Sequence, residues 1–141
     1  MLRGYRRRVA LAALLAMAAG SAAASPELDY MLQCQGCHLG DGTGKPPEVP
    51  SLAGFVGRFL GVPGGREYLV QVPGSAQSPL SDAELAGVLN WMIRRYGPER
   101  IAADFAPYTA AEVAGQRGSP LVDVATRRRS LIAAIERERE P

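Results

Sequence analysis

The sequence predicts an all-α fold in a single domain. Few stretches of the chain alternate between apolar and polar residues, so the pattern that a β-sheet requires is missing. Two capping boxes, Ser81 with Glu84 and Thr109 with Glu112, are typical of helix starts, because hydroxyl and carboxylate satisfy each other's free backbone amides. The length of 141 residues suits one domain of ordinary size rather than two.

The first 24 residues have the three parts of a secretory signal peptide. Four arginines between residues 3 and 8 precede an apolar stretch over residues 9–19, and small residues follow at 21–24. The apolar stretch is shorter than the roughly 20 residues that span a bilayer. We therefore expect residues 1–24 to be removed, leaving a periplasmic chain with no transmembrane segment. The alternative is an uncleaved amphipathic anchor.

The composition excludes several classes of protein. Without the four arginines of the leader, 12 basic and 14 acidic residues leave a net charge of −2. A nucleic-acid-binding protein is expected to carry a basic stripe, so this balance argues against one. One histidine and two cysteines are too few for multi-ligand zinc fingers or four-cysteine iron–sulfur centres.

Three helices are expected in the second half of the chain, after a loop-rich region over residues 36–79 with many prolines and glycines. The second follows Thr109 and stops near residues 118–120, and the third runs from about 121 to 137. The arginines at 127–129 are expected on its solvated face, with a docking patch as the alternative. The first follows Ser81, ends at Gly97 and Pro98, and carries apolar residues at helical spacing: Leu85, Val88, Leu89, Met92 and Ile93.

The two cysteines and the single histidine lie within five consecutive residues, CQGCH. On a helical turn, the spacings of three and four residues place Cys34, Cys37 and His38 on one face. Two thiols at this spacing can add to the two vinyl groups of a haem, while the adjacent imidazole reaches the iron. The motif is therefore a candidate site for covalent haem.

Other interpretations of the cysteine pair are weaker. A disulfide oxidoreductase of the thioredoxin kind would place the motif in a βαβ pattern, which the sequence does not have. A zinc site would need a fourth ligand beyond two cysteines and one histidine, and the chain has no further cysteine or histidine.

The 21 residues from Cys34 onward, CQGCHLGDGTGKPPEVPSLAG, resemble class I cytochromes c. The resemblance implies one haem c bound through Cys34 and Cys37, with His38 as the proximal iron ligand. It also implies that the carbonyl of Pro50 accepts the proton of the other imidazole nitrogen and so orients the ring. Leu52 is then expected to pack on the haem face, and the glycines at 40, 42 and 44 to supply the positive φ angles of the intervening loop.

The resemblance extends to about residues 26–96. Tyr30 occupies the aromatic position of the family's first helix and Trp91 that of its last, two helices that cross beside the haem. It implies a cytochrome c domain over 25–97, followed by a C-terminal helical extension over 98–141 that has no counterpart in the minimal pattern. The extension is expected to cover the distal side of the domain, to dock onto a partner enzyme or simply to extend the fold.

The sixth iron ligand is where the sequence departs from the family. Most class I cytochromes c have a methionine in the loop before the last helix, and here residues 72–80, VPGSAQSPL, contain none. The mature chain retains Met31, on the proximal side near Cys34, and Met92, on the apolar face of the last helix. Met92 is the candidate ligand. A vacant or water-bound iron, or another donor such as a lysine, tyrosine or amide, is the alternative.

The function expected from these observations is electron transfer rather than catalysis. A single haem c would pass electrons between periplasmic redox proteins, from a dehydrogenase to an oxidase or another cytochrome. One alternative is a haem enzyme or gas-binding protein with an open sixth coordination position, although a single histidine leaves no imidazole as distal acid or base. Another is a cytochrome subunit that a dehydrogenase holds through residues 98–141.

Overall fold

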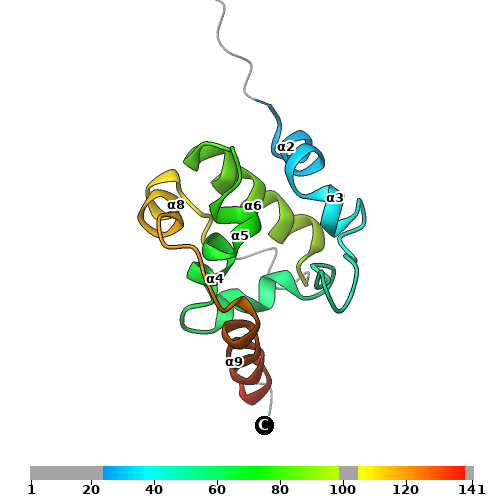
Figure 1. Ribbon diagram of the computed structural model, residues 1–141, viewed down its shortest axis with the longest axis vertical. Coiled ribbons are helices and arrows are strands. Elements are labelled where there is room, and N and C mark those ends of the chain that lie inside the picture. Colours follow the sequence, from blue (N-terminus) through cyan, green and yellow to red (C-terminus); the bar gives the residue numbers. More distant parts are fainter. Residues whose placement is uncertain (1–23, 99–104, 139–141) are drawn as a thin grey trace, which may run out of the picture.

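A computed structural model describes residues 24–98 and 105–138, and within these ranges the fold is all-α, as predicted (Figure 1). The only β pairing in these ranges is an isolated bridge between Lys45 and Val49. The predicted signal peptide lies outside the described residues except for its last position. The elements are α2 (Pro26–Gln33), α3 (Gln35–His38), η1 (Val56–Gly61), α4 (Gly65–Gln71), α5 (Pro73–Ala76), α6 (Asp82–Tyr96), α8 (Ala110–Arg117) and α9 (Val124–Arg137).

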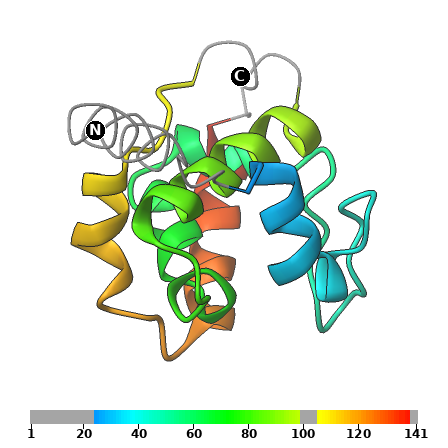
Figure 2. The same ribbon diagram turned by 90° about the horizontal axis from the view of Figure 1, so that it is seen from above.

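Helix α6 is the central element, and its sequence sets both of its ends. The side chain of Ser81 accepts a hydrogen bond from the Glu84 amide at 3.3 Å, and the Glu84 carboxylate accepts one from the Ser81 amide at 2.7 Å. This confirms the first capping box. The helix ends before Gly97, where a Cβ atom would collide with the carbonyl of Ile93. In Figures 1 and 2, α2 with α3 lies on one side of α6, and α8 lies on the other.

Helices α2 and α6 pack through aromatic side chains, as the resemblance implies. The ring centroids of Tyr30 and Trp91 are 5.0 Å apart, and the Tyr30 side chain is only 1% exposed. The Tyr30 hydroxyl donates a 2.7 Å hydrogen bond to the carbonyl of Leu39, the residue that follows the CQGCH motif. At the other end of the crossing, Gly87 lets α6 approach Pro26, the first residue of α2. The crossing therefore fixes α3 relative to α6.

The C-terminal segment shares the core of the rest of the chain. Helix α8 packs against α6 and α4, and α9 packs against η1 and α4. The Asn90 side chain of α6 donates to the Tyr108 carbonyl at 3.0 Å and accepts from the Tyr108 amide at 2.7 Å. Four buried side chains from this segment join the same hydrophobic cluster as α6: Tyr108, Val113, Leu131 and Ile135. Within the described part of the chain, residues 105–138 thus form one core with residues 24–98.

Two details differ from the sequence-based expectation. Thr109 caps α8 by accepting from the Glu112 amide at 3.2 Å, but the Glu112 carboxylate pairs with Arg66 at 2.8 Å instead of completing the capping box. The ion pair with Arg66 replaces the capping bond because a guanidinium offers a carboxylate two charge-assisted hydrogen bonds. Helix α9 begins at Val124 rather than near 121, because the Asp123 side chain caps it.

No helix in the two described ranges is both long enough and apolar enough to cross a membrane.

Candidate functional site

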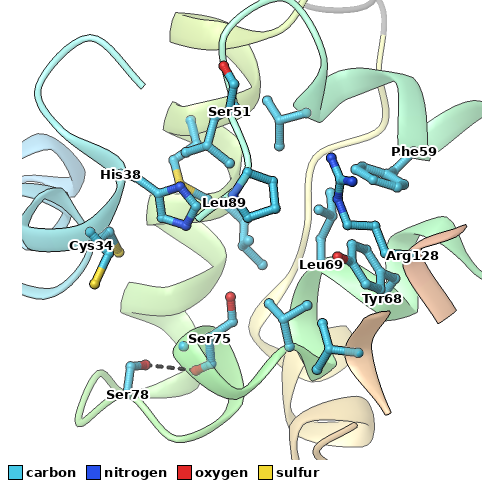
Figure 3. A pocket seen from close by; sticks show the side chains of 18 of the residues that line it. Cys34, His38, Ser51, Phe59, Tyr68, Leu69, Ser75, Ser78, Leu89 and Arg128 are labelled. Atoms are coloured by element: carbon cyan, nitrogen blue, oxygen red, sulfur yellow. Dashed lines mark hydrogen bonds between the residues drawn. The ribbon is translucent and has the colours of Figure 1, made fainter. Parts of the chain in front are cut away.

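A cavity of about 570 Å³ opens in the middle of the fold (Figure 3). Its walls come from α3, the loop at 47–52, η1, the α4–α5 segment, α6 and α9. Most of the lining side chains are apolar, among them Val56, Leu69, Val88 and Leu89. An open, mainly apolar cavity of this size is the candidate binding site of the fold.

The CQGCH motif forms one wall of this cavity. Cys34, Cys37 and His38 all line it, which agrees with the single face expected from their spacing. The His38 amide donates to the Cys34 carbonyl at 3.0 Å, so the motif makes a helical turn. Burial, together with the nearby carboxylate of Asp29, raises the pKa of the Cys34 thiol to about 11. Cys34 is partly buried and Cys37 is exposed, so the second thiol of this wall lies at the protein surface.

His38 is held in the form that binds a metal. Burial lowers the pKa of its imidazole, and the carbonyl of Pro50 opposes this shift. The ring is thus largely neutral near pH 7, and neutral imidazole is the form with a free lone pair for iron. Pro50 faces the ring as expected, but Nδ1 is buried without a hydrogen bond of standard geometry to any described residue. Nδ1 thus lies on the Pro50 side of the ring, which leaves Nε2 as the nitrogen with a lone pair for a ligand in the cavity.

The loop after the motif needs glycine at two positions. Gly42 has φ 75°, and a Cβ atom there would lie 2.8 Å from the ring of Tyr96. Gly44 has φ 66°, and its Cβ atom would meet the carbonyl of Val49 at 2.5 Å. The third glycine expected in this role, Gly40, does not adopt a positive φ, and Leu39 does so instead. The loop is therefore folded back tightly beneath α6.

The remaining predicted residues fall into two groups. Leu52 and Met92 line the cavity, and Met92 is buried in the core at 7% exposure. Its ligation of an iron stays a prediction. Tyr30 and Trp91 are absent from the cavity lining and lie instead at the crossing of α2 and α6. Their predicted contact with the haem stays a prediction.

Two polar residues of the cavity were missed in the sequence. Tyr68 is 6% exposed, and its hydroxyl has no hydrogen bond to a described residue. Arg128, half-buried on α9, lies beside it with a guanidinium that makes no hydrogen bond or ion pair within the described ranges (Figure 3). Burial raises the pKa of Tyr68, while the charge of Arg128 opposes that shift. The arginine run was expected on a solvated face, but Arg128 and Arg129 both line the cavity, Arg128 half-buried and Arg129 exposed.

These residues fit a covalently attached haem. The motif wall offers two thiols and one imidazole, the cavity offers apolar contacts for a porphyrin ring, and Arg128 with Tyr68 offers donors for carboxylates. Among the described residues there is no cluster of three or more His, Cys, Asp or Glu side chains that would hold a bare metal ion. The donor set therefore favours a prosthetic group over a simple ion.

A helical fold around a cavity walled by CQGCH defines a c-type cytochrome, and the chain belongs to class I of that family. The membership is shown by cytochrome c-552 of Thermus thermophilus, which is 36% identical over 107 residues, covering 63% of this chain and 82% of the relative. A second cytochrome c-552 of the same species is likewise 36% identical over 107 residues, covering 72% of that relative. No family model matches the chain.

Proposed function

We propose that this protein is a periplasmic electron carrier with a single covalently bound haem c. The observation that carries the proposal is the convergence of Cys34, Cys37 and His38 on one wall of an apolar cavity in a class I cytochrome c. When bound, the haem supplies an iron that gains or loses one electron. The protein's part is to hold this group, to fix its axial ligand and to bring one edge near the surface.

Each wall residue has a distinct part in holding the haem. Cys34 and Cys37 attach it through thioether bonds, and the neutral imidazole of His38 binds the iron. The carbonyl of Pro50 faces the imidazole of His38 and so restrains the orientation of the ring. Leu52 packs within the cavity on the same loop as Pro50. A covalent bond retains the haem in an exported protein, where a dissociated cofactor would be lost.

The haem also brings two carboxylates, which need donors inside the protein. Tyr68 and Arg128 present a phenol and a guanidinium to the cavity, and neither makes a hydrogen bond or ion pair to a described residue, although the guanidinium lies 5.9 Å from the Phe55 ring centroid. Both groups can donate hydrogen bonds to a carboxylate, and the guanidinium adds a positive charge, so a carboxylate between them would be stabilised. We assign these two residues to a propionate of the haem.

Contact with redox partners is proposed at the attachment edge. Cys37 is exposed, and three large apolar side chains near the motif are exposed as well: Met31 at 52%, Leu32 at 67% and Leu39 at 45%. An apolar surface of this kind suits the small, transient contacts of electron-transfer encounters. A dehydrogenase as donor and an oxidase or cytochrome as acceptor are the partner classes that we propose.

The C-terminal segment is proposed to belong to the cytochrome domain rather than to serve as a separate docking arm. Tyr108, Val113 and Leu131 are buried in the common core, so they are not free to bind a partner enzyme. Two α9 residues, Val124 and Arg128, line the cavity itself. The segment thus contributes part of the wall of the proposed haem site.

The proposal is tested on the exported protein after haem attachment. Mass spectrometry is expected to show a chain that begins at Ser25 and carries the mass of one haem, and redox titration is expected to show one reversible one-electron step. Replacing both Cys34 and Cys37 with serine is expected to abolish covalent haem, whereas Ser78→Ala, also on the cavity wall, leaves it attached. A wild-type chain without covalent haem, or with more than one, would contradict the proposal.

A further inference from the structure

We propose that the sixth coordination position of the haem iron is open in this protein and binds a small neutral diatomic ligand, with the hydroxyl of Ser75 as its hydrogen-bond donor. The inference rests on the proposed function only for the attachment of haem at Cys34 and Cys37 and its ligation by His38. The ligand class is that of carbon monoxide and nitric oxide. Binding of such a ligand goes beyond electron transfer.

The position of His38 defines which wall faces the sixth coordination position. Its imidazole points into the cavity from one side, and Ser75 lies across the cavity from it (Figure 3). Axial ligands bind on opposite faces of a haem, so a sixth ligand from the protein has to come from the wall opposite His38. Tyr68 and Arg128 lie at a third side, beside Phe59 and Leu69 (Figure 3).

The wall opposite His38 is built from residues 72–80, and it contains no strong iron ligand. Val72, Gly74, Ser75, Ser78 and Leu80 line the cavity there. This stretch of sequence has no histidine, cysteine, methionine or lysine. The wall therefore offers the iron only aliphatic groups and two hydroxyls.

The two hydroxyls of this wall are not equivalent. The Ser78 hydroxyl donates a 2.9 Å hydrogen bond to the Ser75 carbonyl and is thus already engaged. The Ser75 hydroxyl has no hydrogen bond to a described residue, and it points into the cavity toward His38 (Figure 3). Ser75 is thus the one side chain of this wall with a free donor for a ligand at the iron.

Met92 lies at the wrong end of α6 to fill the position. It precedes Tyr96 by one turn, and the Tyr96 hydroxyl donates to the Gly40 carbonyl at 2.9 Å, beside the CQGCH motif. The start of α6 at Ser81 follows directly from the 72–80 wall, and Met92 lies 11 residues further on, about 16 Å along the helix axis. Met92 thus belongs to the His38 side of the cavity, with Leu89 between it and the opposite wall.

Hydrogen bonds from Arg117 hold the 72–80 wall in place. This wall therefore does not move to bring a more distant iron ligand into the cavity. Nη2 of Arg117 donates to the Ser78 carbonyl at 2.8 Å, and Nη1 of the same side chain donates to the Leu80 carbonyl at 2.7 Å. These bonds run from α8 to the backbone of the segment that follows Ser75. The space opposite His38 is therefore a fixed feature of the fold.

The chemistry of the wall selects the ligand class. Residues 72–80 carry no titratable side chain, so no acid or base is present there to protonate or cleave a bound molecule. They carry no positive charge that would favour an anion. Val72 and Leu80 with one neutral hydroxyl suit a small uncharged ligand whose outer atom accepts a single hydrogen bond.

Carbon monoxide is the probe that tests the inference, used on the haem-loaded, reduced protein. The wild type is expected to be high-spin and to bind carbon monoxide fully. Ser75→Ala is expected to raise the C–O stretching frequency in the infrared spectrum and to speed dissociation by about fivefold, the effect of one lost hydrogen bond. The matched control is Ser130→Ala, an exposed serine of α9 that does not line the cavity, and its loss is expected to leave both measurements unchanged.

Three results would overturn the inference. A low-spin ferric wild type with a sulfur-to-iron charge-transfer band that Met92→Leu removes would establish Met92 as the ligand. If no variant of the haem-loaded protein bound carbon monoxide, another side chain of the protein would be the sixth iron ligand. Carbon monoxide binding that Ser75→Ala leaves unaltered would remove Ser75 from the site. Loss of covalent haem would instead refute the proposed function, so the two failures are distinguishable.

Discussion

The guanidinium of Arg117 donates a 2.8 Å hydrogen bond from Nη2 to the carbonyl oxygen of Ser78. The same side chain, only 17% exposed, pairs with the carboxylate of Asp82 at 3.0 Å. Helix α8 is thereby tied to the connection between α5 and α6. The C-terminal part of the chain therefore fixes the cavity wall that faces His38.

Replacing Arg117 with methionine is expected to destabilise the haem-loaded protein. The change leaves the Ser78 and Leu80 carbonyls without their charged donor, and hydrogen bonds to charged groups contribute about 1.5–3 kcal/mol. We expect a loss of about 2 kcal/mol in the free energy of unfolding. For a domain of this size, the melting temperature then falls by on the order of 8 °C.

Thermal unfolding followed by circular dichroism measures the Arg117→Met effect. The matched control is Arg129→Met, which removes an exposed guanidinium that also lines the cavity and whose single hydrogen bond among the described residues is to the Thr126 hydroxyl. Its effect is expected to stay within about 0.5 kcal/mol. Equal losses in the two variants would show that the bonds to the 72–80 wall add no stability.

A chain that ends at Gly97 is expected not to form a cooperatively folded haem protein. Truncation there removes Tyr108, Val113, Leu131 and Ile135 from the core. Burying one such side chain stabilises a protein by roughly 1.5–3 kcal/mol, so losing four removes an amount comparable to the whole stability of a domain. A chain that ends at Glu138 keeps all of α9 and serves as the control.

Limited proteolysis and thermal unfolding decide the truncation prediction. The chain ending at Glu138 is expected to resist protease as the full chain does, while the chain ending at Gly97 is digested. If the shorter chain melts cooperatively at nearly the same temperature, residues 98–141 are a separate extension after all.

Alanine substitution is expected to have opposite consequences at Gly42 and Gly36. Gly42 has φ 75°, and a Cβ atom would come within 2.8 Å of the Tyr96 ring. We expect Gly42→Ala to cost about 2 kcal/mol or more from backbone strain and overpacking together. Gly36 lies in α3 between the two cysteines, and its Cβ atom would meet nothing within 4 Å. Gly36→Ala is therefore expected to be neutral or to stabilise by roughly 0.5 kcal/mol.

Urea unfolding of the two haem-loaded alanine variants measures this difference. Similar midpoints for Gly42→Ala and Gly36→Ala would mean that the loop under Tyr96 adapts to a side chain at no cost.

The parts of the structure that the sequence predicts are those set by neighbouring residues. Ser81 and Glu84 cap α6 because they lie three residues apart. Gly97 ends the same helix at a position where a side chain would collide with the Ile93 carbonyl. Cys34, Cys37 and His38 share a wall because a single helical turn brings them together. In each case the physical cause lies within four residues of the effect.

The parts that the sequence does not predict depend on partners far along the chain. The Glu112 carboxylate leaves its capping role for Arg66, which lies 46 residues earlier. Arg128 turns toward Tyr68 only because α9 packs on η1 and α4. No local pattern shows that Arg128 and Arg129 line the cavity while Arg127 does not, until the rotation of α9 is known. Both cases are tertiary contacts overriding a local preference.

Tyr108 is expected to make the stability of the protein fall at alkaline pH. The side chain is 3% exposed, and its hydroxyl donates to the Arg66 carbonyl at 3.0 Å. Burial raises its pKa well above the ordinary value near 10, although the charge of Arg66 opposes the shift. Above pH 10 the unfolded chain therefore loses the Tyr108 proton while the folded chain keeps it, and the free energy of unfolding decreases as pH rises.

Tyr108→Phe isolates this contribution in the haem-loaded protein. At pH 8 the variant is expected to be less stable by about 1 kcal/mol, the contribution of one hydrogen bond. Between pH 10 and 11 the difference is expected to shrink by up to about 1.4 kcal/mol per pH unit, since one proton is involved. Tyr30 and Tyr68, whose pKa values are also raised, remain in both proteins and cancel in the comparison. Parallel curves of unfolding free energy in urea from pH 8 to 11 would show that Tyr108 ionises as readily in the folded chain as in the unfolded one.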